Sequence, residues 1–507
     1  MDFQSFCSVP APLVETVRGP VRGCREGDVE VFKGIPYGRA GRFRAPEPVP
    51  AWKEPLDATS YGCVCPLLSM EKPGGELLVP HRYWVQNEDC LNLNVWTPGS
   101  QGKRPVLVWL HGGGYFAGSS IEQMAYEGGN MARLGDCVVV SINHRLNILG
   151  YFDLSEFGAA YENSGNAGGD DIVLALRWVR ENIAAFGGDP DNVTVFGQSG
   201  GGAKVTTLLQ TPAADSLYHR GVVMSGVIGP LLADTTGSAR ECAEAMMAEL
   251  NVSGVDGLER VSYAQLAAAY NKVSPALKAQ GKPVGCTPSP NRFYLGDPLV
   301  SAAGFREETV NIPLMVGTVY AEFLGFMNST SVTVEELFSP EEREELLPLF
   351  RAAYPGRPDG DLLALDTIFR SPTIRYIKAR AARGGRVFSY LFQQDFPING
   401  GSKAWHCADI PFFFHNRELV PVCCFPGAAA LEERMFRALL SFARTGRPQA
   451  DGEDGWSEST PEKEYTYLFG PDCRQEVNFD HRLIRAWEPL SAEMMERMTR
   501  SGAQIQH

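Results

Sequence analysis

The chain has 507 residues and a formal net charge of −14, with 60 acidic and 46 basic side chains. Because the basic residues form no cluster, this charge argues against nucleic acid or an anionic membrane as a partner. No apolar run reaches the ~18 residues of a membrane span, and residues 1–8 lack the basic-then-apolar layout of a signal peptide, so we expect a cytoplasmic location.

Strand-like and helix-like segments alternate along the whole chain, and no repeat or low-complexity linker separates them. We therefore predict one α/β domain over residues 1–507, with a large, mostly parallel sheet flanked by helices. Two more polar stretches, about residues 231–306 and 322–371, contain amphipathic helices such as Pro340–Phe350. These stretches are interpreted as insertions that form a cap over the functional site; plain surface helices are the alternative.

The first chemical motif follows an apolar strand predicted at Val106–Leu110, which leads into His111 and three glycines. Backbone N–H groups can approach a developing oxyanion closely only where no side chain stands in the way. The motif therefore predicts an oxyanion hole with Gly113 and Gly114 as donors. A flexible loop is the alternative interpretation.

The clearest helix is predicted over residues 171–186, with Asp170 or Asp171 at its start and Gly187-Gly188 at its end. A β-branched strand follows it and breaks into Gly197-Gln198-Ser199-Gly200-Gly201. In this G-x-S-x-G pattern the serine occupies a strained turn between strand and helix, with its hydroxyl exposed for attack. A phosphate loop would need a lysine directly after its last glycine, and here Ala203 precedes Lys204.

Ser199 is thus the predicted nucleophile, and Gly200 the third oxyanion donor. A serine nucleophile needs a base and an acid, which in this arrangement follow in the order Ser, acid, His. An apolar strand at Ile312–Thr318 ends in a loop that holds Glu322, the predicted acid. Asp361 and Asp366 are alternatives in helix-like sequence, where we expect a solvated surface.

The base is expected to follow a strand predicted at Arg386–Gln393. The loop after this strand carries His406, which we predict to be the base. His415 is the alternative, but its neighbours, three phenylalanines, are more typical of packing. Twelve cysteines, without paired C-x-x-C spacing, predict neither a disulfide scaffold nor a metal site.

Beyond these motifs the chain resembles the type-B carboxylesterase and lipase family, which includes bacterial para-nitrobenzyl esterases, mammalian carboxylesterases, cholinesterases and the non-catalytic neuroligins. The resemblance extends from about Pro12 to Pro489. The segments that carry it are Phe32–Gly38, Glu88–Val95, Ala175–Ile183 and Phe186–Thr194.

The resemblance implies an α/β-hydrolase fold, a triad of Ser199, Glu322 and His406, and a supporting serine at Ser225, for which an ordinary buried hydroxyl is the alternative. Cys65 and Cys90 lie where secreted members close a loop by a disulfide; in a cytoplasmic protein they would be reduced thiols. The chain departs from the common family pattern at Gln198 for Glu, Gly200 for Ala, His144 for Tyr, and residues 407–409.

Together these features predict a serine esterase that acts through an acyl-enzyme on neutral, small-to-medium esters, without a cofactor or metal. Its partner would be the small-molecule ester itself. A lipase, amidase or polyester hydrolase on the same triad is the alternative. A neuroligin-like binding module is disfavoured because Ser, acid and His are all present. The sequence leaves the acyl length, the alcohol and the oligomeric state open.

Overall fold

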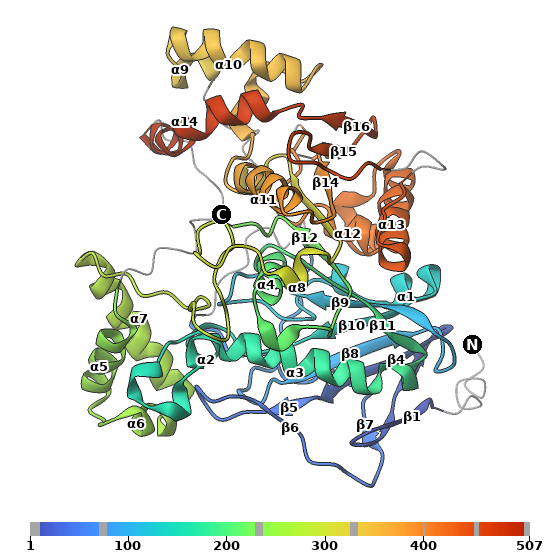
Figure 1. Cartoon of the computed structure of the whole chain (residues 1–507), viewed down its shortest axis with the longest axis vertical. Coiled ribbons are helices and arrows are strands. Elements are labelled where there is room, and N and C mark those ends of the chain that lie inside the picture. Colours follow the sequence, from blue (N-terminus) through green and yellow to red (C-terminus); the bar gives the residue numbers. More distant parts are fainter. Residues whose placement is uncertain are drawn as a thin grey trace.

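The computed structural model describes residues 11–69, 79–228, 237–324, 333–398, 401–450 and 456–500. At its centre is a sheet of eleven strands in the order β16-β15-β14-β13-β12-β11-β9-β10-β8-β4-β3 (Figure 1). The strands are β3 (Cys24–Glu26), β4 (Val29–Pro36), β8 (Asn92–Thr97), β9 (Arg104–Leu110), β10 (Val138–Ile142), β11 (Gly188–Gln198), β12 (Arg220–Met224), β13 (Leu314–Val319), β14 (Val387–Phe392), β15 (Tyr465–Phe469) and β16 (Arg474–Val477).

The interior of this sheet is parallel from β10 through β9, β11, β12, β13 and β14 to β15. Antiparallel strands close both ends, with β8, β4 and β3 on one side and β16 on the other. This topology confirms the predicted α/β fold with a large, mostly parallel sheet. Because parallel strands point the same way, the loops after β9, β11, β12, β13 and β14 all emerge at one edge.

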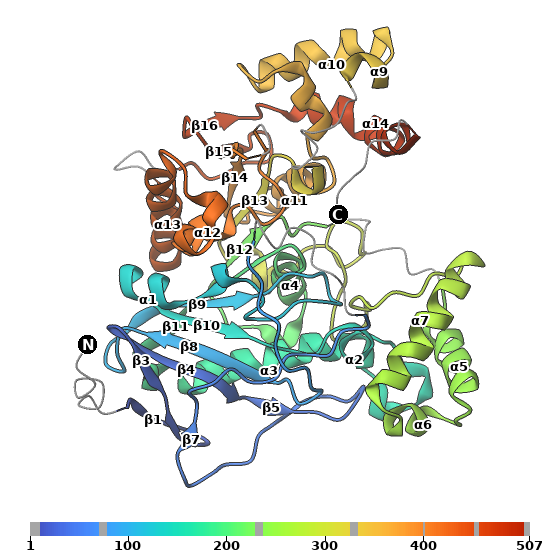
Figure 2. The ribbon, with the colours of Figure 1, turned by 180° about the vertical axis from the view of Figure 1, so that it is seen from behind.

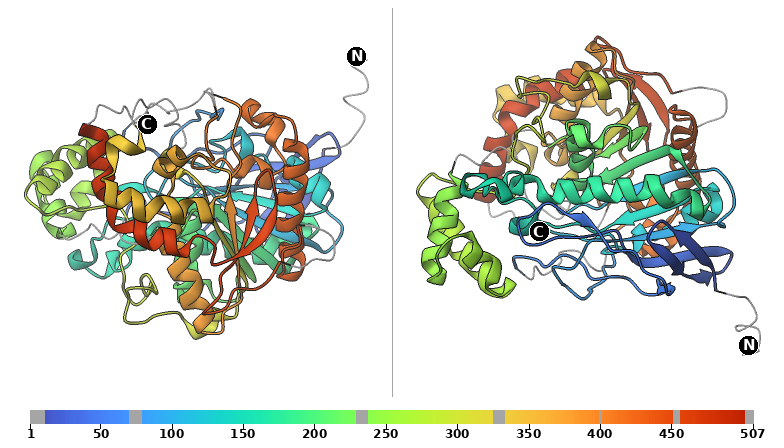
Figure 3. Two further views of the ribbon diagram at one scale, coloured as in Figure 1. Left: turned by 90° about the horizontal axis from the view of Figure 1, so that it is seen from above. Right: turned by 60° about the horizontal axis from the view of Figure 1, so that its bottom comes forward.

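Both faces of the central parallel strands are buried, and strands such as β9 and β13 are therefore mostly apolar. In β9, Val106 and Val108 point into one hydrophobic core, whereas Leu107 and Trp109 point into the other. Helices α3 (Ala167–Asn182) and α4 (Gly200–Leu209) pack in the first core, and Figure 3, right, shows α3 lying across the sheet. The second core is covered by α1 (Gly129–Gly135), α12 (Ile410–Phe413) and α13 (Ala428–Thr445).

The two predicted insertions form separate helical groups (Figure 2). The first group contains α5 (Ala239–Leu250), α6 (Val255–Arg260) and α7 (Tyr263–Ala279). The second contains α9 (Val334–Leu337) and α10 (Pro340–Ala353), which lies beside α14 (His481–Arg500) in Figure 3, left. Residues 231–236 and 325–332 of these insertions lie outside the described residues. No helix in the described part of the chain is long and apolar enough to cross a membrane.

The remaining elements lie around this core. They are the sheet of β1 (Leu13–Thr16), β2 (Gly19–Arg22) and β7 (Leu56–Asp57), the pair β5 (Gly38–Arg39) and β6 (Glu47–Pro48), and the helices α2 (Asn147–Gly150), α8 (Glu307–Val310) and α11 (Arg370–Ala382).

The start of α3 differs from the prediction. The helix begins at Ala167 and not at Asp170 or Asp171. Asp171 does not cap it, because its carboxylate accepts two hydrogen bonds from the buried Arg145 guanidinium, at 2.6 and 2.8 Å. The predicted end is correct: a 3-10 turn continues α3 to Phe186, and the helical conformation ends at Gly187, whose φ is 78°.

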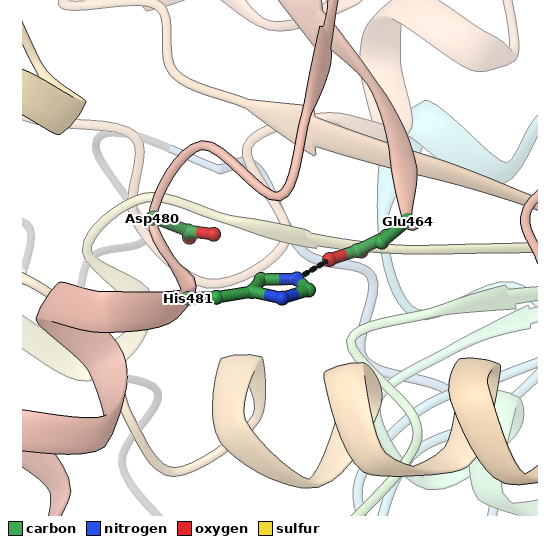
Figure 4. Close-up of side chains that lie close together, drawn as sticks. All are labelled: Glu464, Asp480 and His481. Atoms are coloured by element: carbon green, nitrogen blue, oxygen red, sulfur yellow. Dashed lines mark hydrogen bonds and ion pairs between the residues drawn. The ribbon is translucent and has the colours of Figure 1, made fainter. Parts of the chain in front are cut away.

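A buried charge network ties α11 to the carboxyl-terminal elements. Arg370 is fully enclosed and donates to Glu464 at 2.8 and 3.0 Å and to Asp480 at 2.7 Å. His481, the first residue of α14, lies 2.5 Å from Glu464, and Figure 4 shows Asp480 and His481 facing that carboxylate. Burial opposes the charge of Glu464, but Arg370 and His481 more than offset it and hold the pKa of this carboxyl below its ordinary value.

We expect Arg370→Met to lower the free energy of unfolding by about 3–5 kcal/mol, because it leaves two buried carboxylates without their cation. Thermal or urea unfolding of the purified variant measures this loss. Arg375→Met is the matched control on the same helix, since Arg375 pairs with Glu488 at 2.7 Å with both side chains more than 40% exposed. Loss of that surface pair should cost less than ~1 kcal/mol. Equal losses in the two variants would contradict the role given to the network.

Candidate active site

Ser199 lies between the end of β11 and the start of α4. Its backbone angles are φ 57° and ψ −126°, a strained turn for a residue with a side chain. The Ser199 N–H donates to the Met224 carbonyl at 2.8 Å, and its own carbonyl accepts the Ala203 N–H at 2.9 Å. A Cβ at Gly197 would lie 2.5 Å from the Gly201 carbonyl carbon, so only glycine fits there. The geometry is that of a nucleophile elbow.

The glycine loop after β9 lies directly against this elbow. A Cβ at Gly200 would come within 2.1 Å of the Gly114 carbonyl oxygen, and one at Gly112 within 3.5 Å of the Ser199 Cβ. Gly113 and Gly114 adopt φ values of 85° and 63°, which favour glycine. The structure therefore brings the three predicted oxyanion donors, from two separate segments, next to the predicted nucleophile.

Glu322 and His406 meet at the same edge of the sheet, from the loops after β13 and β14. His406 Nδ1 lies 2.5 Å from Glu322 Oε2, and the His406 N–H donates to the Glu322 carbonyl at 2.7 Å. Glu322 Oε1 accepts from Ser225 Oγ at 2.7 Å and from the Val319 N–H at 3.1 Å. Because a carboxylate only accepts hydrogen bonds, Nδ1 of a neutral imidazole carries the proton, and Nε2 is then the acceptor atom of the ring.

The alternative acids have other partners. Asp361 lies 3.0 Å from Arg357 and 2.9 Å from Lys403. Asp366 accepts three backbone N–H groups at the start of α11, from residues 368–370. The expectation that both are solvated is wrong, since both are buried. Each is retained inside the fold because cations or N–H groups satisfy its oxygens.

The alternative base, His415, has a packing environment, as expected. Its ring meets Phe436 edge-on at 5.1 Å, and its two nitrogens lie 3.6 Å from Glu432 and Glu433. It contacts neither Ser199 nor Glu322 through any hydrogen bond among the described residues.

Two further carboxyls are buried near Glu322. Burial, together with the negative charge of Glu322, raises the pKa of Asp366 well above its ordinary value. Burial raises the pKa of Asp409 to about 7, and the Tyr390 hydroxyl donates to this side chain at 2.8 Å. Each carboxyl therefore keeps its proton to a higher pH than an exposed carboxyl does.

Three neighbours of His406 were not predicted from the sequence. The rings of Phe323 and Phe369 lie 4.7 and 5.2 Å from its imidazole. The Gln198 side-chain nitrogen lies 3.2 Å from His406 Nε2, and the Gln198 oxygen accepts from the Cys407 thiol at 3.1 Å. Gln198 and Phe323 adjoin motif residues in the chain, but no motif marks Phe369, which α11 brings from elsewhere.

A cleft of about 320 Å³ adjoins the glycine loop. Phe116 and Ala117 of that loop line it together with Tyr270 of α7. The other lining residues are Leu67, Leu68, Ser69, Asn271, Gly285 and Cys286. The cleft thus joins the loop beside Ser199 to the first insertion.

The described residues contain one group with the spacing of metal ligands, formed by Glu464, Asp480 and His481. The Arg370 guanidinium already binds both carboxylates, so a cation placed there would meet a positive charge. These residues therefore fit a structural ion pair and not a metal centre.

Cys65 and Cys90 are buried free thiols. A hydrogen bond with Cys65, together with burial, raises the pKa of the Cys90 thiol well above its ordinary value.

Residues 10–353 and 359–484 match the sequence profile of the Carboxylesterase family. The para-nitrobenzyl esterase of Bacillus subtilis (strain 168) is 34% identical over 461 residues, which cover 87% of this chain and 91% of that protein. The phenmedipham hydrolase of Pseudarthrobacter oxydans is 30% identical, with 88% and 93% covered. A solved esterase from Clostridium hathewayi, described as able to hydrolyse aliphatic aromatic polyesters, superposes with a TM-score of 0.88 at 49% identity, covering 94% of this chain and 98% of its own. The chain therefore belongs to the carboxylesterase family, whose α/β-hydrolase enzymes cleave carboxylic esters.

Proposed function

We propose that this carboxylesterase works through an acyl-enzyme on Ser199, with His406 as general base and Glu322 as its acid partner. The observation that carries the proposal is the Glu322–His406 hydrogen bond of 2.5 Å at the sheet edge from which Ser199 emerges. The other carboxylate oxygen of Glu322, Oε1, accepts hydrogen bonds from Ser225 Oγ and the Val319 N–H. These two bonds orient the carboxylate so that Oε2 faces the His406 imidazole.

In this mechanism His406 Nε2 takes the proton of Ser199 Oγ as the oxygen attacks the ester carbonyl carbon. The negative charge that develops on the carbonyl oxygen is stabilised by the N–H groups of Gly113, Gly114 and Gly200. His406 then gives its proton to the leaving alcohol, and an acyl-enzyme remains. Water repeats the sequence, releases the acid and restores Ser199.

We further propose that the two insertions supply the substrate pocket. Tyr270 of the first insertion lines the cleft beside the glycine loop, and Phe323 and Phe369 of the second lie against His406. The proposal includes a cytoplasmic location, for which the support is cysteine usage: twelve cysteines without the spacing of a disulfide scaffold.

An aryl phosphonate is expected to label Ser199 alone, because Ser199 is the hydroxyl to which the proposed mechanism assigns a base and an oxyanion hole. Intact mass and peptide mapping identify the adduct. Ser199→Ala should neither react nor hydrolyse p-nitrophenyl acetate above background, whereas Ser225→Ala should still be labelled. An adduct on another serine would refute the assignment of the nucleophile.

Glu322→Gln is expected to lower kcat by about a thousandfold or more while the fold is kept, since an amide can hold the imidazole in the wrong tautomer. The control is Asp361→Asn, whose carboxylate pairs with Arg357 and Lys403 instead of His406. Steady-state kinetics and circular dichroism on both variants decide the question. Near-normal turnover in Glu322→Gln together with an inactive Asp361→Asn would show that Glu322 is not the catalytic acid.

Neutral esters are expected to be better substrates than choline esters. Gln198 is buried between Cys407 and His406 and brings no negative charge to the site. We expect kcat/KM for 3,3-dimethylbutyl butyrate to exceed that for butyrylcholine, its cationic isostere. Gln198→Glu should shift this ratio toward the cation by roughly tenfold, or ~1.4 kcal/mol, a modest effect for opposite charges in a partly buried site. A wild-type preference for butyrylcholine would refute the proposal.

A second candidate function is polyester hydrolysis, favoured by apolar rings that remain exposed at the site. Phe116 and Phe323 are 48% and 50% exposed although they adjoin the glycine loop and His406. We expect release of soluble products from an aliphatic–aromatic copolyester film, and Phe323→Ala should reduce this release more than hydrolysis of p-nitrophenyl acetate. Val300→Ala, at an exposed apolar residue outside the cleft, is the control. Product release no faster than with Ser199→Ala would eliminate this candidate.

A further inference from the structure

Lys204 is a buried cation in the second turn of α4, the helix that begins after Ser199. Only 1% of this residue is exposed. Its Nζ donates to the carbonyl oxygen of His111 at 2.9 Å. His111 directly precedes the Gly112–Gly114 loop, so this hydrogen bond connects the elbow helix to the base of the oxyanion loop.

Two histidines, His111 and His144, lie near enough to Lys204 to interact with its charge. The rings of His111 and His144 stack at 5.0 Å, and each Nδ1 faces a carbonyl, of Gly112 at 2.9 Å and of Arg145 at 3.0 Å. Because a carbonyl only accepts, both Nδ1 atoms carry hydrogen, and both Nε2 atoms are buried without a hydrogen-bond partner among the described residues. Burial, with Lys204 nearby, lowers the pKa of both histidines well below the ordinary value, so both are neutral.

Burial has the largest effect on the pKa of Lys204. It lowers the pKa of Lys204 to about 7, and the negative charge of Glu122 opposes that shift. The Tyr115 ring lies 5.9 Å from the ammonium. An ammonium that is removed from water and given one neutral acceptor costs folding free energy, and a methionine of similar length would fill the space at lower cost. The hydrogen bond to His111 therefore contributes little net stability.

Steric contact and this hydrogen bond act on the same stretch of backbone. A Cβ at Gly201 would lie 2.0 Å from the Leu110 oxygen and 2.9 Å from the His111 oxygen, so the end of β9 is pressed against α4. Contact alone prevents further approach but does not prevent separation. The Lys204 N–H supplies the attractive interaction that holds the His111 carbonyl in place.

We propose that Lys204 is a positioning residue of the ester hydrolysis: it holds the Gly112–Gly114 loop at the distance from Ser199 that oxyanion stabilisation requires. This inference rests on the proposed function of Ser199 and the oxyanion hole. Gly200 comes from the elbow, whereas Gly113 and Gly114 come from the loop, so the three donors converge only if the two segments keep a fixed separation. A shift of about 1 Å in such an arrangement can cost on the order of a hundredfold in rate.

The test compares Lys204→Met, which removes the donor but keeps the length of the side chain, with wild type. We expect kcat for p-nitrophenyl acetate to fall about 10- to 100-fold with KM within about twofold, because the loop acts on the transition state. The Ki of an aryl trifluoromethyl ketone, whose adduct with serine carries an oxyanion, should rise by the same factor as kcat/KM falls. The melting temperature should be equal to or higher than that of wild type.

Two variants separate positioning from stability. Lys204→Gln keeps an N–H donor on a shorter, uncharged side chain and should recover part of the lost kcat. Val205→Ala removes a buried apolar side chain from the same helix and should lower the melting temperature by several degrees without changing kcat or Ki at 25 °C.

The pH dependence of stability gives a second readout. The folded-state pKa of Lys204, about 7, lies below its unfolded value of about 10.4, so the unfolded chain binds more protons between these pH values. Wild type therefore gains stability from this residue as pH rises through that window. Any excess of the melting temperature of Lys204→Met over that of wild type should therefore become smaller as pH rises from 6.5 to 9.5.

Unchanged kcat and Ki in Lys204→Met would overturn the proposal. Failure of that variant to fold, or a loss of melting temperature like that of Val205→Ala, would also overturn it, because the lysine would then be a structural residue. A Ser199→Ala variant that keeps its activity would instead refute the proposed function, whatever the lysine variants show.

Discussion

The close approach of the end of β9 to the start of α4 is the constraint on which the site depends. Parallel pairing of β9 with β11 brings both segments to one edge of the sheet, and glycines then let the backbones touch. With a Cβ at Gly200 the Gly114 oxygen would be only 2.1 Å away, so any side chain there would push the loop from the elbow. The oxyanion donors and the nucleophile are therefore products of the same contact, and neither segment forms the site alone.

Much of this arrangement could be predicted from the sequence because its signals are local. Ser199 and Gly113 lie in short motifs whose glycines have a steric purpose, and Glu322 and His406 each follow an apolar strand. The order of Ser, acid and His along the chain then restricted the choice among eight histidines. The start of α3 was missed because Asp171, which has the composition of a cap, is bound by Arg145 from another segment.

Contacts that depend on tertiary structure could not be predicted from the sequence. Asp361 and Asp366 are acids in helix-like sequence, and a solvated surface was the reasonable expectation; both are buried because partners distant or adjacent in the chain satisfy them. Phe369 directly precedes Arg370, whose buried network ties α11 to the carboxyl-terminal elements, and the Phe369 ring lies 5.2 Å from that of His406. Such contacts have no periodicity or motif, and only the fold brings them together.

Two buried cations show how differently charge is used in this fold. Arg370 meets two carboxylates with four hydrogen bonds, so its desolvation is compensated and the elements that it joins are fixed. Lys204 donates to one neutral carbonyl, and burial lowers its pKa to about 7. The first charge stabilises the scaffold behind His406. The charge of Lys204 costs more folding free energy than its hydrogen bond returns, and it lies against the Gly112–Gly114 loop, whose position the proposed reaction requires. A residue that lowers stability next to a catalytic loop is the pattern expected where activity and stability compete.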